Sequence, residues 1–206
     1  MRVGVLASGG GTNLQALLDT VHGGDVEIVA VASDQPSARA LERARAAGVA
    51  TRVFARGDFP DRATRDAAIA DWLDECEVAL VVLAGYMAIL DDAFLERFAG
   101  RIVNVHPSLL PAFPGVRAVE QALAYGAKVF GVTVHFVEPG EVDSGPIILQ
   151  GAVELPGATD ADEVLAALRP LEHALLPRAV ALVAAGAVRR DEAHPRRVIV
   201  NERAAN

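Results

Sequence analysis

The sequence contains almost no cysteine and no long apolar run. Cys76 is the single cysteine among 206 residues, so no internal disulfide can form, and a reduced, cytoplasmic setting is expected. Although 52% of the residues are hydrophobic, no stretch reaches the ~18 consecutive apolar residues that a membrane-spanning helix needs. The first seven residues are too short for a signal peptide, and no cleavage site follows them. We therefore expect no membrane partner.

Basic residues are also scarce. There are 19 Lys and Arg against 27 Asp and Glu, which gives a formal net charge of −8. A nucleic-acid partner is disfavoured, because a phosphate backbone is bound by a basic face. The histidines and the one cysteine show no metal-ligand spacing, so no metal is expected. Binding of a small anionic ligand is not excluded, because such a ligand needs only a local positive site.

Apolar runs that alternate with helical patterns make up most of the chain. Strands are expected at residues 3–7, 27–32, 51–55, 78–84, 101–106, 128–137 and 146–153. Helices are expected at residues 13–21, 38–47, 62–74, 92–99, 117–125 and 160–184. This alternation predicts a single α/β domain with an open, mainly parallel twisted sheet and helices on both faces. Pro170 and Pro177 should each kink the last helix or end a segment of it.

The first predicted strand leads into a glycine-rich loop, Ser8-Gly-Gly-Gly-Thr-Asn13, and a helix pattern follows at once. Glycines let the backbone approach a ligand closely, and a helix start offers unpaired N–H groups, so phosphate is the expected guest. A Walker loop is excluded because no Gly-Lys-Ser/Thr is present. Leu14 replaces the third glycine of a dinucleotide fingerprint, although Asp34 mimics its ribose-binding acid. A plain tight turn that binds nothing is the alternative.

From residue 102 onward, the fifth predicted strand is apolar except at Asn104 and His106. Residues two apart share one face of a strand, so both side chains should project together near its carboxyl end, where Pro107 stops it. An amide donor beside an imidazole suits stabilisation of an oxyanion, and the imidazole can also move protons. A hydrogen-bonded core pair is the alternative. His135, in the next strand, is expected to be a satisfied structural residue.

The loop at residues 138–146 is rich in turn residues and acids. Glu138 and Glu141 are expected to be solvated. Asp143 differs because Ser-Gly-Pro and an apolar strand follow it directly, which places it where the loop returns to the sheet. A carboxylate at that point could hold an imidazolium.

Together these motifs resemble a known family. The order is SGGGTNLQ, LAGYMAIL, NVHPSLLPAFPG, GVTVHFV, VDSGPIILQ and then LEH in the last helix. This is similar to the phosphoribosylglycinamide formyltransferases (glycinamide ribonucleotide transformylases), folate-dependent enzymes of de novo purine biosynthesis. The resemblance implies the formyltransferase variant of the Rossmann-like fold over residues 1–186, with residues 187–206 as a C-terminal hairpin or tail of the same domain.

The resemblance also implies a role for individual residues. The catalytic roles fall on Asn104, His106 and Asp143. The substrate would be bound by Gly11, Thr12, Asn13, Gly85, Met87, Pro107 and Glu172. The folate would be bound by Arg62, Met87, Ala88, Ile89, Leu90, Asn104, Val137, Glu138, Gly140 and Val142. Ala88 and Ala112 stand where family members carry Arg and Lys, which puts in doubt how the glutamate tail of folate is held.

The implied reaction transfers the formyl group of 10-formyltetrahydrofolate, a co-substrate, to the amine of glycinamide ribonucleotide. The partners would be these small molecules, and a homodimer is left open. A formyltetrahydrofolate hydrolase shares the triad but normally adds an N-terminal domain, whereas here the sheet starts at residue 2. A methionyl-tRNA formyltransferase also shares the triad but adds a basic C-terminal domain, and the net charge of −8 disfavours this alternative. A sugar-amine formyltransferase and a non-catalytic nucleotide-binding Rossmann module stay open as alternatives.

Overall fold

The alternating pattern of the sequence folds into strands and helices close to the expected bounds. The computed structural model describes residues 1–201. It divides into two units, residues 1–104 and the chain from Val105 onward. One sheet has the strand order β3-β2-β1-β4-β5-β6-β7, and a separate pair is formed by β8 and β9.

The first unit is built on parallel strands. The strands are β1 (Arg2–Leu6), β2 (Glu27–Ser33), β3 (Ala50–Val53), β4 (Leu80–Leu83) and β5 (Ile102–His106), the last of which continues into the second unit. The helices are α1 (Thr12–Thr20), α2 (Arg39–Ala46), the short 3₁₀ helix η1 (Arg56–Asp58), α3 (Arg62–Glu75) and α4 (Asp92–Arg97). β1 pairs in parallel with both β2 and β4, so it is central. Its buried apolar run is what a strand covered on both faces requires.

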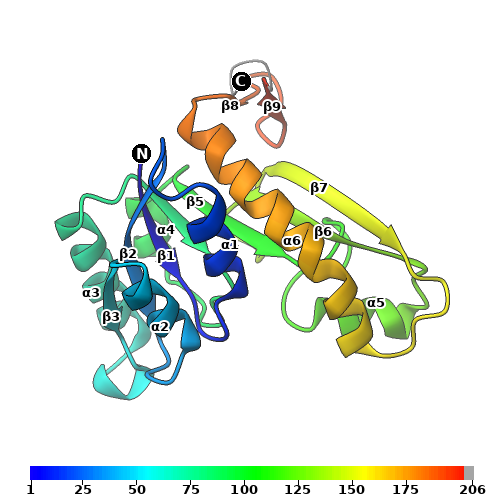
Figure 1. Ribbon diagram of the computed structural model, residues 1–206. Helices are drawn as coiled ribbons and strands as arrows, with labels where there is room; N and C mark the ends of the chain where they lie inside the picture. Colours follow the sequence, from blue (N-terminus) through cyan, green and yellow to red (C-terminus); the bar gives the residue numbers. More distant parts are fainter. Residues whose placement is uncertain (202–206) are drawn as a thin grey trace. The chain divides into compact units, whose positions relative to one another are not determined.

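Connection handedness explains how the helices are divided between the two faces. From β1 the chain moves outward through α1, β2 and α2 to β3, and α3 then carries it back past β1 to β4. Because crossovers between parallel strands are right-handed, the reversed direction places α3 on the face opposite α1 and α2. In Figure 1 α1 and α2 lie beside each other, as do α3 and α4. The prediction of an open, mainly parallel sheet with helices on both faces is confirmed.

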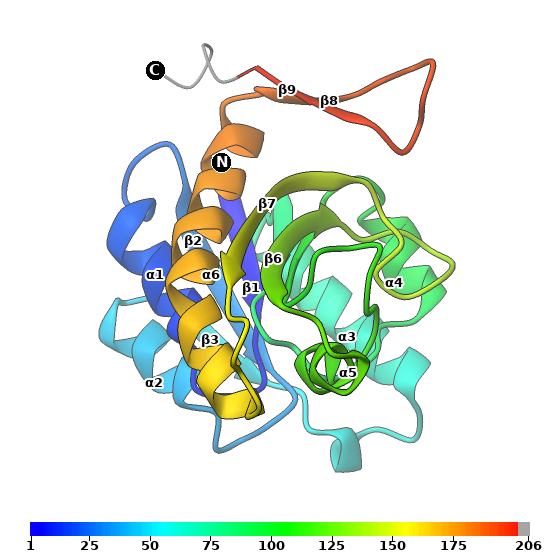
Figure 2. The ribbon, with the colours of Figure 1, turned by 90° about the vertical axis from the view of Figure 1, so that its right-hand side faces the viewer.

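The second unit contains the antiparallel part of the structure. Its elements are α5 (Ala118–Tyr125), β6 (Val129–Phe136), β7 (Ile147–Glu154), α6 (Ala161–Ala184), β8 (Val188–Arg190) and β9 (Val198–Val200). β6 and β7 pair antiparallel, with an irregularity at Val134 and His135. α6 packs against both strands, and the β8–β9 hairpin lies beyond its C-terminal end (Figure 2). This hairpin occupies the stretch expected to be a hairpin or tail, of which residues 202–206 lie outside the described part.

Two prolines do not end α6. The helix continues through Pro170 and Pro177, so the prediction that either could end a segment is wrong. Each proline removes one backbone hydrogen bond, a local loss. Burial of the apolar side of α6, including Leu168, Leu175 and Leu176, against β6 and β7 outweighs it. No helix within residues 1–201 is long and apolar enough to cross a membrane.

Candidate active site

His106 and Asp143 form a buried ion pair in the second unit. His106 ends β5 and is 5% exposed, and Asp143 lies on the loop between β6 and β7. The His106 Nδ1 atom is 3.3 Å from the Asp143 Oδ2 atom. The Asp143 backbone adopts φ 55°, a left-handed conformation that Asp tolerates better than most residues. The sequence predicted that Asp143 returns to the sheet near an imidazole, and the geometry agrees.

Asp143 is also held by two further groups. Its Oδ2 atom accepts a 2.7 Å hydrogen bond from the Gly115 N–H, and its Oδ1 atom lies 3.5 Å from His135 Nε2. Burial by itself would raise the pKa of Asp143. The hydrogen bonds from His135 and Gly115 and the positive charge at His106 together lower that pKa below its ordinary value of 3.8. Asp143 is therefore a carboxylate at neutral pH.

Sequence reasoning missed the position of His135 beside Asp143. This side chain is 1% exposed and its Nδ1 atom lies 2.8 Å from the Phe136 carbonyl oxygen. A signal was available, because Thr133 and His135 are polar residues two apart on an apolar strand, the same pattern as Asn104 and His106. Within the described residues, no group of three or more His, Cys, Asp or Glu side chains is arranged to hold a metal ion.

The second ring nitrogen of His106 also faces an acceptor. Its Nε2 atom lies 2.9 Å from the Phe113 carbonyl oxygen, on the turn whose Gly115 N–H binds Asp143. An imidazole has a donor on both nitrogens only when it is doubly protonated. With a carboxylate at Nδ1 and a carbonyl at Nε2, the charged ring satisfies both contacts. Both ring nitrogens of His106 therefore face an oxygen atom.

The sequence Asp143-Ser-Gly-Pro146 has a steric explanation. A Cβ atom on Gly145 would lie 1.8 Å from the Phe136 carbonyl oxygen, so only glycine allows the loop to return against β6. The Phe136 N–H then donates to the Pro146 carbonyl oxygen. On the same loop, Glu138 forms an ion pair with Arg190 of β8, so it is paired and not simply solvated as expected. The remaining residues assigned to this loop from the resemblance, Val137, Gly140 and Val142, precede Asp143.

Asn104 lies two residues before His106 on β5 and is half-buried. Strand geometry places the two side chains on the same face, as the sequence predicted. Pro107 follows the strand directly. An amide donor and an imidazolium are thus joined by one short piece of strand.

The glycine-rich loop forms the start of α1. Gly11 is the N-terminal cap residue with φ 68°, and a Cβ atom there would lie 2.6 Å from the Ala40 Cα atom. Asp61, Asp91 and Asp160 cap α3, α4 and α6 through their side chains, whereas no side chain caps α1 at Gly11. Thr12 and Asn13 form the first turn of this helix. The first turn of α1 therefore has no carboxylate cap that would repel an anion.

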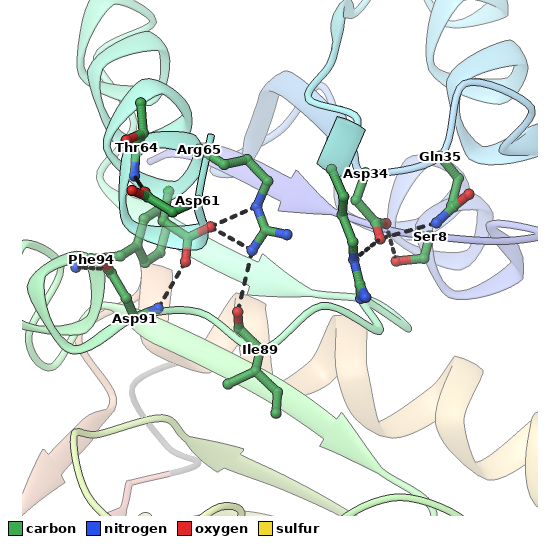
Figure 3. A network of polar contacts seen from close by, with 11 residues as sticks. Ser8, Asp34, Gln35, Asp61, Thr64, Arg65, Ile89, Asp91 and Phe94 are labelled. Atoms are coloured by element: carbon green, nitrogen blue, oxygen red, sulfur yellow. Dashed lines mark hydrogen bonds and ion pairs between the residues drawn. The ribbon is translucent and has the colours of Figure 1, made fainter. Parts of the chain in front are cut away.

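Asp34 is unavailable to a ribose. Its buried carboxylate accepts a 2.5 Å hydrogen bond from the Ser8 hydroxyl, and Figure 3 shows these two side chains facing each other. Arg56 Nε lies 3.7 Å from Asp34 Oδ2. The Ser8 oxygen in turn accepts a 2.8 Å hydrogen bond from the Met87 N–H. Because Asp34 is engaged inside the protein, it does not act as the ribose-binding acid of a dinucleotide site. This observation counts against the nucleotide-binding alternative.

The segment after β4 borders a cavity of about 450 Å³ in the first unit. The cavity is lined by Arg56, Phe59, Pro60, Asp61, Arg62, Arg65, Met87 and Ile89. Met87 and Ile89 are 67% and 62% exposed, whereas Ala88 and Leu90 are buried. Gly85, with φ 74°, starts the segment and accepts a hydrogen bond from the Ser8 N–H. Cations and apolar groups thus line the same cavity.

Glu172 lies on α6 and is half-buried. The next residue, His173, has a pKa lowered by burial and by the nearby Arg169. The assignment of Glu172 to the ribonucleotide stays a prediction.

The mainly parallel sheet and the buried His106–Asp143 pair define a class of protein: an α/β enzyme with a histidine–carboxylate pair at the end of a strand. The comparison with known families makes this specific. Residues 1–180 match the formyl transferase family, and the chain belongs to that family.

Its relatives are consistent with this membership. Phosphoribosylglycinamide formyltransferase from Haemophilus influenzae is 41% identical over 190 residues, which is 91% of this chain and 89% of the relative. The crystal structure of glycinamide ribonucleotide transformylase 1 from Symbiobacterium toebii superposes with a TM-score of 0.92 at 45% identity, covering 97% of this chain and 93% of that one. The trifunctional purine biosynthetic protein adenosine-3 of Drosophila pseudoobscura pseudoobscura is 43% identical over 92% of this chain, but the chain spans only 14% of its length.

Proposed function

We propose that this protein transfers the formyl group of 10-formyltetrahydrofolate to the amine of glycinamide ribonucleotide. The products are formylglycinamide ribonucleotide and tetrahydrofolate, in purine biosynthesis. The observation that carries the proposal is the buried His106–Asp143 pair, with Asn104 two residues earlier on β5, in a member of the formyl transferase family. Relatives with this activity in their names support the choice of acceptor.

The proposed chemistry is direct attack of the amine on the formyl carbon. A tetrahedral species forms, and its negative oxygen accepts hydrogen bonds from the His106 imidazolium and the Asn104 amide. Asp143 holds the ring through Nδ1, which leaves Nε2 to face the substrate once it exchanges the Phe113 carbonyl for the oxyanion. The attacking nitrogen loses a proton and the folate nitrogen gains one, so the C–N bond to folate breaks as a neutral amine leaves.

The proposed phosphate site is the first turn of α1. Gly11, Thr12 and Asn13 offer backbone N–H groups at the positive end of the helix dipole, with no carboxylate cap to compete. Glu172 is assigned to the sugar of the same substrate by resemblance. Gly85, Met87 and Pro107 complete the substrate contacts of the proposal.

The proposed folate site includes the cavity of the first unit. Its volume of about 450 Å³ suits part of a drug-sized ligand. Met87 and Ile89 supply apolar contact, and Arg62 and Arg56 supply positive charge for the carboxylates of the glutamate tail. Arg56 is thus a cation that the sequence did not assign, and it offsets the absence of Arg at position 88.

The proposal is tested by incubating the protein with 10-formyltetrahydrofolate and a panel of acceptors, and measuring tetrahydrofolate. We expect turnover with glycinamide ribonucleotide and none with water or an amino sugar nucleotide. Fast turnover without any amine would identify a hydrolase instead. Equal efficiency with the dephosphorylated riboside would overturn the phosphate assignment of Gly11, Thr12 and Asn13.

A further inference from the structure

The segment between β4 and α4 contributes Met87 and Ile89 to the lining of the cavity, and these two residues are called its wall below. The segment contains no helix or strand. Met87 and Ile89 point large apolar side chains outward, and residues 85–90 form no helix or strand. A segment of this kind is held in one shape only by contacts with its neighbours. The groups that supply those contacts therefore decide how the cavity is shaped.

A buried ion pair on α3 supplies two of them. The Arg65 Nε and Nη2 atoms donate to Asp66 Oδ1 at 2.8 and 2.6 Å, and Arg65 Nη2 also donates to the Ile89 carbonyl oxygen at 3.2 Å. The other carboxylate oxygen, Asp66 Oδ2, accepts a 2.8 Å hydrogen bond from the Asp91 N–H. Figure 3 shows these contacts converging on the segment from α3. Asp91 in turn caps α4 by accepting from the Phe94 N–H.

The other end of the segment has a separate anchor. There the Met87 N–H donates to the Ser8 hydroxyl oxygen, which itself donates to Asp34. The segment is therefore attached at Met87 to the end of β1, and at Ile89 and Asp91 to α3.

The Arg65–Asp66 pair on α3 costs free energy to bury, and it does not stabilise the helix that carries it. Arg65 and Asp66 are 4% and 0% exposed, and burying two charges removes them from water. Burial raises the pKa of Asp66, which the hydrogen bonds from Arg65 and Asp91 only partly offset. Successive residues do not face each other on a helix surface, so an i, i+1 pair adds no regular helix stabilisation. Apart from the contacts within the pair, the side chain of Arg65 donates to Ile89 and that of Asp66 accepts from Asp91.

We propose that Arg65 and Asp66 are positioning residues that hold the Met87–Ile89 wall in the shape that receives the folate. In this inference Arg65 does not bind the ligand, although it lines the cavity, because Asp66 and Ile89 engage its guanidinium. Arg62 is left as a ligand-binding cation together with Arg56, whose side chain stays 61% exposed although its Nε atom lies 3.7 Å from Asp34. The identity of the ligand rests on the proposed function; the anchoring role does not.

The test is a double-mutant cycle of Arg65→Met, Asp66→Leu and the combined variant. Each single variant leaves an uncompensated buried charge and should lose stability strongly, whereas the combined variant has no buried charge and should regain most of it. The matched control is Arg97→Gln, because Arg97 of α4 also pairs with carboxylates of α3, and its partners are Asp71 and Asp74.

Three readouts separate positioning from stability. In the combined variant, hydrogen exchange at the Asp91 amide should be at least about tenfold faster, because its acceptor is gone. The KM for 10-formyltetrahydrofolate should rise about tenfold, while the KM for glycinamide ribonucleotide and kcat change less than about twofold. Arg97→Gln should change none of these.

The inference is overturned if the combined variant keeps both wild-type exchange at Asp91 and wild-type KM for the folate, since the pair would then be structural only. An equal rise in the KM of both substrates would also overturn it. Wild-type protein that transfers no formyl group would refute the proposed function, and the exchange measurement would still decide the anchoring role.

Discussion

At the scale of single residues, Asp143 receives contacts from three separate parts of the second unit. His106 comes from β5, His135 from β6 and the Gly115 N–H from the turn before α5. The carboxylate is thereby kept charged, and it holds the His106 ring through Nδ1. Two groups that depend on each other in this way should respond to mutation as one unit.

Asp143→Asn tests this dependence while nearly keeping the shape of the side chain. We expect kcat to fall by about 10²–10⁴-fold, the range of general acid–base and orienting contributions, with little change in acceptor KM. His106→Ala should be at least as damaging, and the double variant should be far less than additive. Steady-state kinetics of the three variants provide the measurement. Near-normal kcat for Asp143→Asn would reduce Asp143 to an ordinary loop carboxylate.

The lowered pKa of Asp143 also predicts an acid-dependent stability. A carboxylate whose pKa is depressed on folding stabilises the folded state above its unfolded pKa, and this contribution is lost as pH falls through the folded value. We expect wild type to have a larger unfolding free energy than Asp143→Asn at about pH 5, and we follow this difference toward lower pH. It should shrink as pH falls below the ordinary value of 3.8. Urea unfolding over this range measures it, and a difference that grows toward low pH would contradict the assigned direction.

At the scale of elements, the loop between β6 and β7 depends on a glycine. Gly145→Ala would place a methyl group against the Phe136 carbonyl oxygen, so the backbone carrying Asp143 must shift. We expect a loss of about 1–3 kcal/mol in the free energy of unfolding, typical of overpacking, together with reduced kcat. Gly157→Ala is the control, because its Cβ would meet no atom within 4 Å. Equal behaviour of the two variants in urea unfolding would show that the loop adapts freely.

At the scale of the whole molecule, charge is distributed unevenly. The net charge of −8 repels an anionic ligand at long range, whereas Arg56 and Arg62 place positive charge on the lining of the cavity where we propose that the folate binds. These two cations, contributed by η1 and α3, are the proposed replacement for the charge that Ala88 lacks.

These opposing terms predict a salt response with a definite sign. Folate affinity of the wild type should fall as salt rises from about 50 to 500 mM, because local attraction is screened. In Arg56→Ala/Arg62→Ala only the long-range repulsion remains, so affinity should be lower, by about 1 kcal/mol per lost contact, and should stay level or rise with salt. Titration calorimetry with tetrahydrofolate provides the measurement. An unchanged, falling salt dependence in the double variant would place the binding cations elsewhere.

Local pattern by itself determined the order of the strands and helices along the chain, and it placed His106, one member of the His106–Asp143 pair, beside Asn104. Buried strands such as β1 and β4 are short apolar runs, and the alternation with helical patterns allows little besides a parallel sheet. Asn104 and His106 could be placed together because they are two residues apart on one strand, where geometry follows from the chain itself.

Only the tertiary structure decided the contacts between residues that are distant in the chain. Three such contacts depend on how loops return to their neighbours. They are His135 with Asp143, the Phe113 carbonyl with His106, and the Asp66-paired Arg65 with Ile89. The continuity of α6 through two prolines was likewise decided by packing against β6 and β7, not by local propensity. Propensity and periodicity act over a few residues, whereas these contacts depend on the burial and register of whole elements.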